Sequence, residues 1–508
     1  MTARLVGIAL YALILIAIGV IASRRMKDIR DYYAAGKKLS FWSVAFSARA
    51  TGESAWLLLG LTGMGAALGV KAFWVVLGEV LGVGAAWLLM ARRFRRLTGD
   101  EHYDAVTIPD YLEDRFADTT RRVRSFAALA LVVFVTIYVS AQIDATGKAF
   151  EFFLGWNYYV GAIVGFSVVL VYLVTGGFLA VAWSDVFQGA LMFGGLVLLP
   201  LVAVGGAGGI EGVTTALAAA DPNLLSWTGG AGMTAVSIAG ILSLLLIGLG
   251  FLGSPQIFVR FLAIRDEKEI AAGAAVALVW TVLADSGAVA IGLIGRAVLV
   301  DSGADVVAVL GANAENVLPR LVEATFPAFI VGIFVAIVLS AIMSTVDSLL
   351  ILASSAAVRD WHQKVKNPDL SDEQLVGLSR KVTFGLALAA LAIALVVAVS
   401  TPDRTVFWFV IFGWSGIAAT FCPTMILSLY WSGMTARGAL AAMVCGFAGV
   451  PIFKFVGPHL PVIGDFLKAL GELPPAFALS FLAAVVVSRM DSVGPPPNAV
   501  ADLSAAAR

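Results

Sequence analysis

Long apolar runs, separated by short polar stretches, dominate the pattern along this 508-residue chain. About 20 consecutive apolar residues in a helix cross the hydrocarbon core of a membrane. Thirteen windows come close to or exceed this length, so the pattern predicts an all-α polytopic membrane protein with about thirteen transmembrane helices. The windows lie near 5–22, 42–66, 72–91, 123–150, 158–178, 181–204, 235–262, 270–298, 326–354, 377–400, 404–430, 436–456 and 471–488.

These windows form one predicted transmembrane domain, 1–488. The remaining segment, 489–508, is a short tail with a Pro-rich and Ala-rich composition, for which we expect disorder. The loop 299–325 is acidic and helix-compatible, and we expect it to form an external helix.

The basic residues of the loops predict the orientation, because cytoplasmic loops carry an excess of Lys and Arg. The loop 205–234 contains neither residue. With an odd number of spans, all basic clusters fall on one side, with the N-terminus outside and the C-terminus cytoplasmic in a cell membrane. Arg24 directly follows the first span, which favours a retained helix over a cleaved signal peptide. The basic clusters lie at 24–38, 92–124, 260–268 and 359–366.

The composition argues against several classes of function. The chain is 60% hydrophobic and 13% charged, with a mean hydropathy of +0.93, which is not the composition of a soluble enzyme with one anchor. A formal net charge of zero makes nucleic acid an unexpected partner. Cys422 and Cys445 lie in apolar runs and the three histidines are scattered, so neither a disulfide framework nor a Cys- or His-based catalytic site is expected.

The second predicted span carries a polar cluster in its centre: Arg49, Thr51, Gly52, Glu53 and Ser54. A charge at the bilayer centre costs about 2.5–3.5 kcal/mol on insertion scales, so such residues usually mark an ion or substrate path. Gly52, among small residues, also marks a place where the helix can open and expose carbonyl groups. The alternative is a packing face in which Arg49 and Glu53, one turn apart, form a structural ion pair.

The seventh span contains a second interruption between Ile247 and Gln256. Three glycines and Pro255 within this stretch predict unwound backbone at mid-depth. It lies five spans after the first interrupted helix. Paired interruptions at matching places are typical of inverted-repeat transporters with a binding site at the midplane. The alternative is an ordinary proline kink.

Further polar residues lie in the ninth and sixth spans. Ser344, Thr345, Asp347 and Ser348 offer oxygen ligands over little more than one helical turn, which suits a hard cation. The alternative for the hydroxyl groups is a hydrogen bond to their own helix. Asp185 begins the sixth span and could be a second cation ligand, a proton carrier or a charge at a helix N-terminus.

The fourth span carries two pairs of polar residues. Tyr138 and Gln142 lie one turn apart and could share an inward face. Asp144 and Lys148 are also one turn apart, and their order favours a structural ion pair. The remaining intramembrane charges are Glu79, Asp285 and Arg296, and Asp285 could pair with Arg49 or with Arg296.

Several motifs of the chain resemble those of the sodium/solute symporter family, and they occur in family order from about residue 5 to residue 488. The resemblance implies a LeuT-type core of two inverted five-helix repeats, at about 42–204 and 235–430. It also implies a non-enzymatic function, secondary active symport of Na⁺ with a small organic solute, and no organic cofactor. The matching residues are Ser47, Ser54-x-Trp56, Gly63, Thr107-Ile-Pro-Asp-Tyr111, Thr136-Ile-Tyr138, Gly176 to Asp185, Gly253-x-Pro255, Arg260-Phe261, Met343-Ser344-Thr345, Ser354-Ser355 and Trp431 to Ala441.

The resemblance also implies the site residues. For Na⁺, it points to the backbone carbonyls of Ala50, Glu53 and Ala341 and to the hydroxyls of Ser344 and Thr345. For a second cation or a proton, it points to Asp185, Asp347 and Ser348. For the solute, the resemblance and the polar pattern together point to Gly52, Glu53, Ser54, Tyr138, Gln142, Ile247, Phe251, Ser254 and Pro255.

The chain departs from the proline-carrying members of the family at the solute site. Those members have Ser-Asp-Met-Ser-Gly where this chain has Thr-Gly-Glu-Ser-Ala at 51–55, so a functional carboxylate is absent at Gly52. Glu53 stands next to it, turned by about 100° around the helix. The aromatic Trp and Tyr of those members correspond to Ile247 and Phe251, and their Gln corresponds to Ser254. Proline remains the first expected solute, followed by another small amino acid or carboxylate.

Other functions remain open at this point. Transport could be coupled to protons through Glu53, Asp347 or Asp185. An intramembrane hydrolase is not expected, because no Gly-x-Ser-x-Gly motif or metal-ligand cluster supports it. A membrane sensor is not expected either, because the chain ends shortly after the last span. The expected partners are the solute, Na⁺ and the lipid bilayer, with no obligate protein partner.

Overall fold

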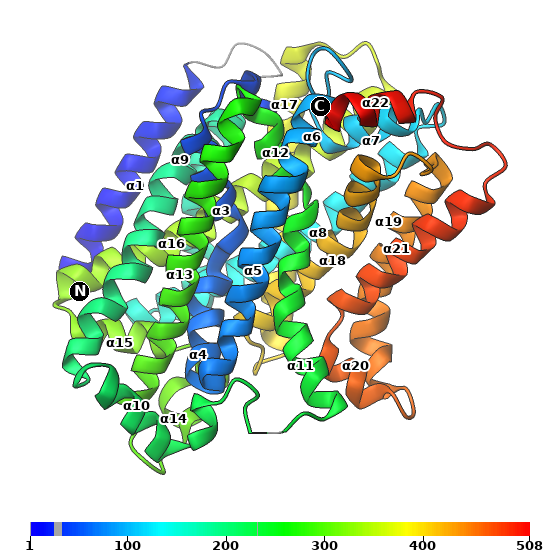
Figure 1. The fold of residues 1–508 in the computed structure, drawn as a ribbon. Coiled ribbons are helices and arrows are strands. Elements are labelled where there is room, and N and C mark those ends of the chain that lie inside the picture. The colour runs from blue at the N-terminus through cyan, green and yellow to red at the C-terminus, as the bar shows by residue number, and fades with distance from the viewer. Residues whose placement is uncertain (1, 25–32, 231, 508) are drawn as a thin grey trace.

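Helices make up the fold of this chain in its computed structural model (Figure 1). The described residues are 2–24, 33–230 and 232–507. Within them, β-structure is limited to one isolated bridge between Leu39 and Ile264, so the predicted all-α fold is confirmed. Arg25, Lys27 and Arg30, which belong to the first predicted cytoplasmic loop, lie outside the described residues.

Eleven helical stretches in the described part of the chain are long and apolar enough to cross a membrane. One of them, Phe41–Leu97, is a hairpin that turns near Gly69 (Figure 1). Another crossing is contained in α9, Tyr158–Gly206, whose 49 residues would form a helix about 74 Å long if it were straight. Gly177 interrupts α9 with non-helical backbone angles. These helices therefore accommodate the thirteen predicted spans.

The other long helices follow the predicted windows. They are α1 (Thr2–Ser23), α3 (Phe41–Ala55), α5 (Phe73–Ala85), α8 (Arg122–Leu154), α11 (Ala235–Leu245), α12 (Pro255–Ala263), α13 (Ile270–Leu299), α16 (Ala328–Ser355), α17 (Asp372–Ser400), α18 (Val406–Tyr430), α19 (Ala436–Pro451) and α21 (Leu473–Met490). The shorter helices are α4 (Thr62–Leu68), α6 (Ala91–Leu97), α7 (Ile108–Phe116), α10 (Gly209–Ala220), α14 (Val306–Leu310), α15 (Val317–Thr325), α20 (Gly464–Leu470) and α22 (Ala499–Ala507). Three further segments have helical turns tighter or wider than those of an α-helix: η2 (Trp56–Leu61), η6 (Leu246–Leu252) and η9 (Ala356–Lys366). Helices α14 and α15 confirm that loop 299–325 is helical, and its external position stays a prediction, whereas α10 was not predicted.

Polar side chains mark where several helices begin. The hydroxyl of Ser40 accepts a hydrogen bond from the backbone N–H of Ser43 at the start of α3, at 3.4 Å. A capping box begins α17, in which Ser371 and Gln374 each accept a hydrogen bond from the other's backbone N–H. Such caps satisfy N–H groups that the first turn of a helix leaves without a partner.

The second and seventh spans are both interrupted near their middle. Ser54 has a φ of 51° and a ψ of −167°, a conformation that costs a non-glycine residue about 1–3 kcal/mol. We predicted the opening at Gly52, and the structure places it two residues later. In the seventh span, Gly253 has a φ of 153° between η6 and α12, so the predicted unwinding of 247–256 is confirmed.

Helix α16 forms the centre of the bundle. All its residues from Val331 to Ser355, except Ile333, are buried. Peripheral helices instead expose apolar side chains, such as Leu13 on α1 and Leu482 on α21. This arrangement is typical of a membrane protein, because lipid tails surround the outer helices and favour apolar side chains there.

Part of the C-terminal tail is ordered, so the prediction of a disordered tail was wrong for α22. Tyr103 donates a hydrogen bond to Asp502 at 2.6 Å, and Arg96 donates one to the carbonyl of Ala506 at 3.3 Å. Leu503 is buried. These contacts come from residues about 400 positions earlier in the chain, and the local composition of the tail does not reveal them.

Helix α5 and the turn η6 approach each other so closely that only glycine fits between them. A Cβ atom on Gly78 would lie 2.0 Å from the carbonyl oxygen of Leu245, and one on Gly82 would lie 2.1 Å from that of Gly248. Figure 1 shows α5 beside α11, the helix that leads into η6. The small residues thus hold the interrupted seventh span against the third span.

We predict that Gly82→Ala destabilises the protein by about 1–3 kcal/mol, because the added methyl group meets backbone that cannot move aside cheaply. Gly84→Ala is the matched control on the same helix, since its Cβ would lie 3.5 Å from Leu278. Thermal unfolding of the purified variants in detergent measures the difference. Equal melting temperatures for the two variants would contradict the close contact.

Candidate functional site

The two interrupted helices meet in the interior of the bundle. A Cβ atom on Gly52 of α3 would lie 3.0 Å from the ring of Phe251 in η6, and both residues are buried. The indole N–H of Trp56, just after the first interruption, donates to the carbonyl of Gly52 at 3.4 Å. The two predicted interruptions therefore form one region.

Helix α18 supports the unwound backbone of the seventh span. Trp414 donates its indole N–H to the carbonyl of Ile247 at 3.2 Å, and the thiol of Cys422 lies 3.4 Å from the carbonyl of Gly250. The hydroxyl of Ser254 lies 3.8 Å from the same thiol. These groups satisfy carbonyls that the helix interruption leaves without a partner.

Helix α8 supports the interruption of α3 in the same way. The amide oxygen of Gln142 accepts a hydrogen bond from the backbone N–H of Ala55 at 3.1 Å, and the phenol of Tyr138 donates to the hydroxyl of Ser54 at 3.4 Å. Tyr138 and Gln142 therefore share one inward face, as the spacing indicated. All nine residues that we predicted for the solute are buried, and they lie on α3, α8 and the interrupted seventh span.

The residues predicted for Na⁺ come together between α3 and α16, with one exception. The hydroxyl of Ser344 donates to the carbonyl of Ala50 at 2.9 Å, and that of Thr345 donates to the carbonyl of Thr51 at 3.1 Å. Both hydroxyls also lie 3.2 Å from the carbonyl of Ala341. Carbonyl and hydroxyl oxygens are hard ligands, so this set fits Na⁺ as a transported ion.

The exception is the carbonyl of Glu53, which accepts a hydrogen bond from the backbone N–H of Trp56 at the interruption. The carbonyl of Thr51, which was not among the predicted Na⁺ ligands, instead accepts from Thr345. The contact geometry thus favours Ala50 and Thr51 as the α3 carbonyls that face α16.

A guanidinium group occupies the region that we predicted for a second cation. Nη2 of Arg260 lies 3.0 Å from Oδ2 of Asp185 and 2.8 Å from the hydroxyl of Thr51, and it also contacts the hydroxyl of Ser348. Ser47 donates to Asp185 at 2.6 Å. A second cation at Asp185 would therefore compete with a positive charge already placed there. The third predicted residue of this set, Asp347, accepts the backbone N–H of Ser348 at 2.6 Å.

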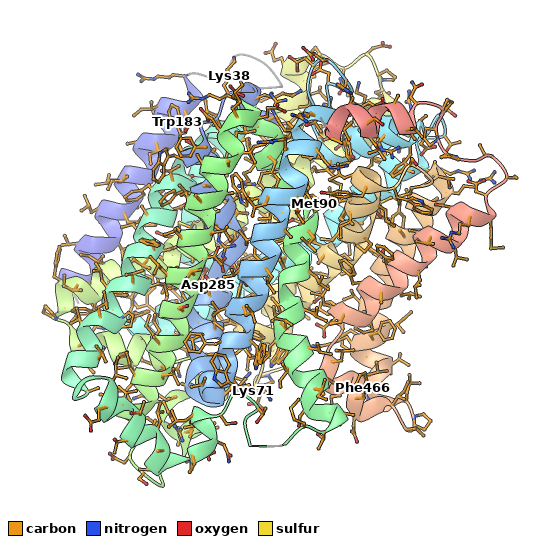
Figure 2. The ribbon with its side chains drawn as sticks, viewed as in Figure 1. Lys38, Lys71, Met90, Trp183, Asp285 and Phe466 are labelled. Carbon is orange, nitrogen blue, oxygen red and sulfur yellow. The ribbon has the colours of Figure 1, made fainter. Side chains whose placement is uncertain are left out.

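A second buried charge cluster lies on another face of α3. Nη2 of Arg49 contacts Glu53 and lies 3.2 Å from Glu79 and 3.6 Å from Asp285. The ion pair between Arg49 and Glu53, which the sequence offered as the alternative, therefore forms, and Asp285 pairs with Arg49 and not with Arg296. Figure 2 shows Asp285 near the middle of the bundle, between the ends marked by Lys38 and Lys71.

Asp144 belongs to a further ion-pair network. Its carboxylate lies 2.5 Å from Nη2 of Arg404 and accepts the hydroxyl of Tyr158 at 2.6 Å. The predicted partner Lys148 is also present, at 3.8 Å. The predicted ion pair of Asp144 with Lys148 therefore forms, with Arg404 as the nearer partner of Asp144.

Sequence reasoning missed several residues of the site, chiefly Trp414, Cys422 and Trp280. Trp280 donates to the carbonyl of Gly189 at 3.2 Å. No periodic pattern distinguishes these residues from lipid-facing or packing residues. Arg260 was part of a family motif, but the sequence did not reveal its contact with Asp185, 75 positions away.

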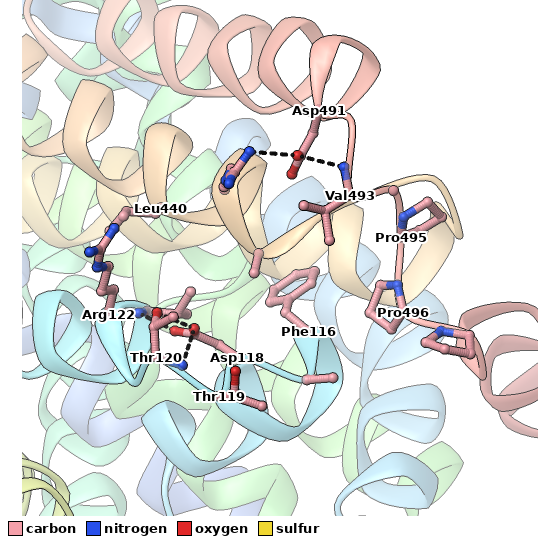
Figure 3. Close-up of a pocket in the computed structure, with 16 residues that line it drawn as sticks. Phe116, Asp118, Thr119, Thr120, Arg122, Leu440, Asp491, Val493, Pro495 and Pro496 are labelled. Atoms are coloured by element: carbon pink, nitrogen blue, oxygen red, sulfur yellow. Dashed lines mark hydrogen bonds and ion pairs between the residues drawn. The ribbon is translucent and has the colours of Figure 1, made fainter.

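The end of the bundle that carries the predicted cytoplasmic loops has a cavity of about 470 Å³ (Figure 3). It is lined by the α7–α8 connection, the start of α19 and the chain after α21, with Arg437 paired to Asp491 at 3.1 Å. None of the predicted site residues lines it.

An ion-pair cluster ties α7 to its neighbours at this end. Arg124 lies 2.6 Å from Asp110 and 2.9 Å from Asp360, and Arg359 also contacts Asp110. Burial acts to raise the pKa of Asp110, but the guanidinium groups of Arg359 and Arg124 outweigh it and hold the pKa below its usual value. This stabilisation is present at neutral pH and is lost as the pH falls through the lowered pKa.

The chain is similar to known proteins over almost its whole length. Residues 32–446 match the sodium:solute symporter family. The high-affinity proline transporter PutP of Bacillus subtilis (strain 168) is 36% identical over 488 residues, which cover 96% of this chain and 98% of that protein. The sodium/proline symporter of Escherichia coli (strain K12) is 33% identical over 501 residues, which cover 98% and 94%.

Among solved structures, a Na⁺-coupled sialic acid symporter in a substrate-bound outward-open state matches with a TM-score of 0.78. The sequence identity is 20%, and the match covers 97% of this chain and 98% of that one. At this identity the likeness concerns the fold, which the two chains share almost from end to end.

We predict that Arg260→Met lowers the stability by about 3–5 kcal/mol, because it leaves Asp185 buried without its partner. The double variant Arg260→Met/Asp185→Asn should recover most of this loss, since it removes both charges. Arg265→Met is the control, because Arg265 is exposed and an exposed ion pair contributes little to stability. Thermal unfolding in detergent measures all three. A double variant as unstable as the single one would contradict the pairing.

Proposed function

The chain belongs to the sodium:solute symporter family, and from this membership we propose that it is a sodium-coupled symporter that imports proline. The observation that carries the proposal is the contact of two hydroxyls of α16 with the carbonyls of α3 beside its interruption. The family and the relatives named above are transporters. The mechanism described below needs no covalent chemistry.

The Na⁺ part of the proposal rests on the oxygen atoms between α3 and α16. Ser344 and Thr345 donate to Ala50 and Thr51 at 2.9 and 3.1 Å, and these four oxygens with that of Ala341 offer a compact set of hard ligands. Na⁺ bound there would exchange these hydrogen bonds for ion–oxygen contacts. It would thereby change the contacts between α3 and α16. An ion shifts the equilibrium between two conformations of a protein only if it binds them with different affinity.

The solute part rests on the relatives and on the region between the interruptions. Both relatives named above are described as proline transporters. Helix α12 begins at Pro255 after the interruption, and the N-terminus of such a half-helix favours a carboxylate. We place proline between this helix start, Ser54 and Tyr138, with Phe251 as an apolar wall. Gly52, where proline-carrying members have a carboxylate, makes another small amino acid or carboxylate the next candidate.

The driving force is adequate for accumulation. A monovalent cation gains about 2.3 kcal/mol for each 100 mV of membrane potential. A gradient of Na⁺ adds to this, so one Na⁺ per solute supports accumulation of tenfold or more, at about 1.4 kcal/mol for each factor of ten.

We further propose a multi-pass position in the cell membrane with the C-terminus in the cytoplasm. The basic clusters of the loops, including Arg96, Arg124 and Arg359, support this orientation. Arg96 contacts the C-terminal helix α22, and Lys38 (Figure 2) lies at the same end of the bundle.

We predict that Ser344→Ala/Thr345→Ala lowers Na⁺-driven uptake of labelled proline by about tenfold or more, since it removes two proposed Na⁺ ligands and a loss of about 1.4 kcal/mol in binding is a factor of ten. The measurement uses proteoliposomes with an inward Na⁺ gradient, an inward H⁺ gradient or neither. The matched control is Ser354→Ala, whose hydroxyl bonds to its own helix at Ile351. A panel of small amino and carboxylic acids tests the solute.

If the double variant takes up proline as fast as the wild type under the Na⁺ gradient, the proposed Na⁺ ligands are wrong. Accumulation of a different member of the panel, with proline inactive, would keep the symport mechanism and replace the solute.

A further inference from the structure

The cluster of Arg49, Glu53, Glu79 and Asp285, called the Arg49 cluster below, has an unusual charge balance. Three carboxylates from α3, α5 and α13 share one guanidinium group, and their oxygens lie within 4.8 Å of one another. All four side chains are at most 1% exposed. The cluster would carry a net charge of −2 in the membrane interior if every group were ionised, which is strongly unfavourable there.

The hydrogen bonds of the Arg49 cluster are also incomplete. Oε2 of Glu53, both oxygens of Asp285 and one oxygen of Glu79 accept no hydrogen bond, although they are buried, whereas Oε1 of Glu53 contacts Nη2 of Arg49. Nε and Nη1 of Arg49 donate none. The rings of Phe251 and Trp280 lie 5.1 and 5.3 Å from the guanidinium carbon. Acceptors without a donor, surrounded by apolar side chains, indicate that the cluster binds a ligand that supplies a hydrogen-bond donor.

We propose that the Arg49 cluster binds a proton, shared by Glu79 and Asp285, and that transport carries this proton inward together with Na⁺ and the solute. The proton comes from water on the outer side and returns to water on the cytoplasmic side. This proposal rests on the proposed symport function, which it extends to a second coupling ion.

A proton fits the Arg49 cluster better than a metal cation does. Nη2 of Arg49 already lies among the three carboxylates, and it would repel a cation placed at the same point. A proton on a carboxyl oxygen adds the missing donor, needs no cavity and reduces the negative charge. Two neighbouring carboxylates in a dry site commonly share one proton for this reason.

The other charged and titratable groups around the cluster do not neutralise it. Arg260 and Asp185 pair with each other on another face of α3, and Arg296 lies three turns away from Asp285 along α13. The turn η6 contributes no titratable residue. Tyr138 on α8 is a neutral phenol whose hydroxyl bonds to Ser54, and Asp347 on α16 accepts the N–H of Ser348. Asp144 and Lys148, also on α8, belong to the network of Arg404.

The Arg49 cluster is directly connected to the proposed Na⁺ and solute sites through α3. Arg49 precedes Ala50, whose carbonyl faces Ser344, and Glu53 lies between Gly52 and Ser54. When α3 moves to open the site, water reaches the cluster and can solvate the carboxylates. The proton is then free to leave, which links its release to the movement that releases the solute.

The test compares the wild type with Glu79→Gln and Asp285→Asn in proteoliposomes. Glu211→Gln is the control, since Glu211 is an exposed carboxylate on α10. Labelled proline uptake is measured over a range of external pH with a fixed Na⁺ gradient, and a pH dye in the lumen reports proton entry. We expect the wild type to acidify the lumen during uptake, and its rate at low solute to rise by up to about tenfold per unit fall in external pH.

Glu79→Gln mimics the protonated carboxyl, so it should keep uptake but lose both the pH dependence and the acidification. A structural ion pair would instead lose uptake equally at every pH. Wild-type uptake without acidification, or an unchanged pH profile in both variants, would overturn the proposal.

Infrared spectra of the purified protein separate this proposal from the proposed function. We expect the carbonyl band of a protonated carboxyl in the wild type, with a reduced band in Glu79→Gln and in Asp285→Asn. If Na⁺-driven uptake fails but the band and its loss are seen, the symport function is wrong and the proton site stands. If the wild type lacks the band, or both variants retain it in full, the proton site is wrong.

Discussion

Unwound backbone in the middle of a membrane protein needs hydrogen-bond partners, and much of this structure serves that need. Carbonyl and N–H groups freed from a helix cost free energy in a low-dielectric interior unless other groups satisfy them. Gln142 accepts a hydrogen bond from the backbone at the interruption of α3, and Trp414 donates one to the backbone of the interrupted seventh span. The hydroxyls of Ser344 and Thr345 contact two further carbonyls of α3. These carbonyl and hydroxyl oxygens are also the proposed ligands of Na⁺. The atoms that stabilise the interrupted helix are therefore the same atoms that the proposed transport uses.

Helix α3 lies between two buried charge clusters of different character. On one face, Arg260 and Asp185 form a pair that also contacts the hydroxyls of Thr51 and Ser348. On another face, the Arg49 cluster has more negative than positive groups. A paired cluster fixes the position of a helix, because breaking it leaves a bare charge. An unbalanced cluster instead responds to the protons or ions around it. Helix α3, which carries the proposed Na⁺ site, thus contacts a balanced ion pair on one face and the unbalanced Arg49 cluster on another.

The sequence predicted what depends on local pattern and did not predict what depends on distant contacts. Apolar windows and glycines gave the spans and both interruptions, although the first lies at Ser54 and not at Gly52. The spacing predicted Lys148 as a partner of Asp144, but the nearer partner, Arg404, could not be inferred because it lies 260 positions away. The same reason explains why the helix α22 was missed. Hydroxyl spacing on α16 indicated a cation site, but only the structure shows that Thr51, and not Glu53, presents its carbonyl to Thr345.

The carboxylate at position 53 lies in surroundings that differ from those of its neighbour Gly52. Gly52 faces Phe251 at a distance that leaves little room for a larger side chain. Glu53, about 100° further around the helix, instead contacts Arg49 and approaches α5 and α13. A carboxylate there without Arg49 would be a buried, unpaired charge, and Arg49 without Glu53 would lose its nearest partner. These residues therefore depend on one another, and they direct the negative charge of α3 away from α16 and into the Arg49 cluster.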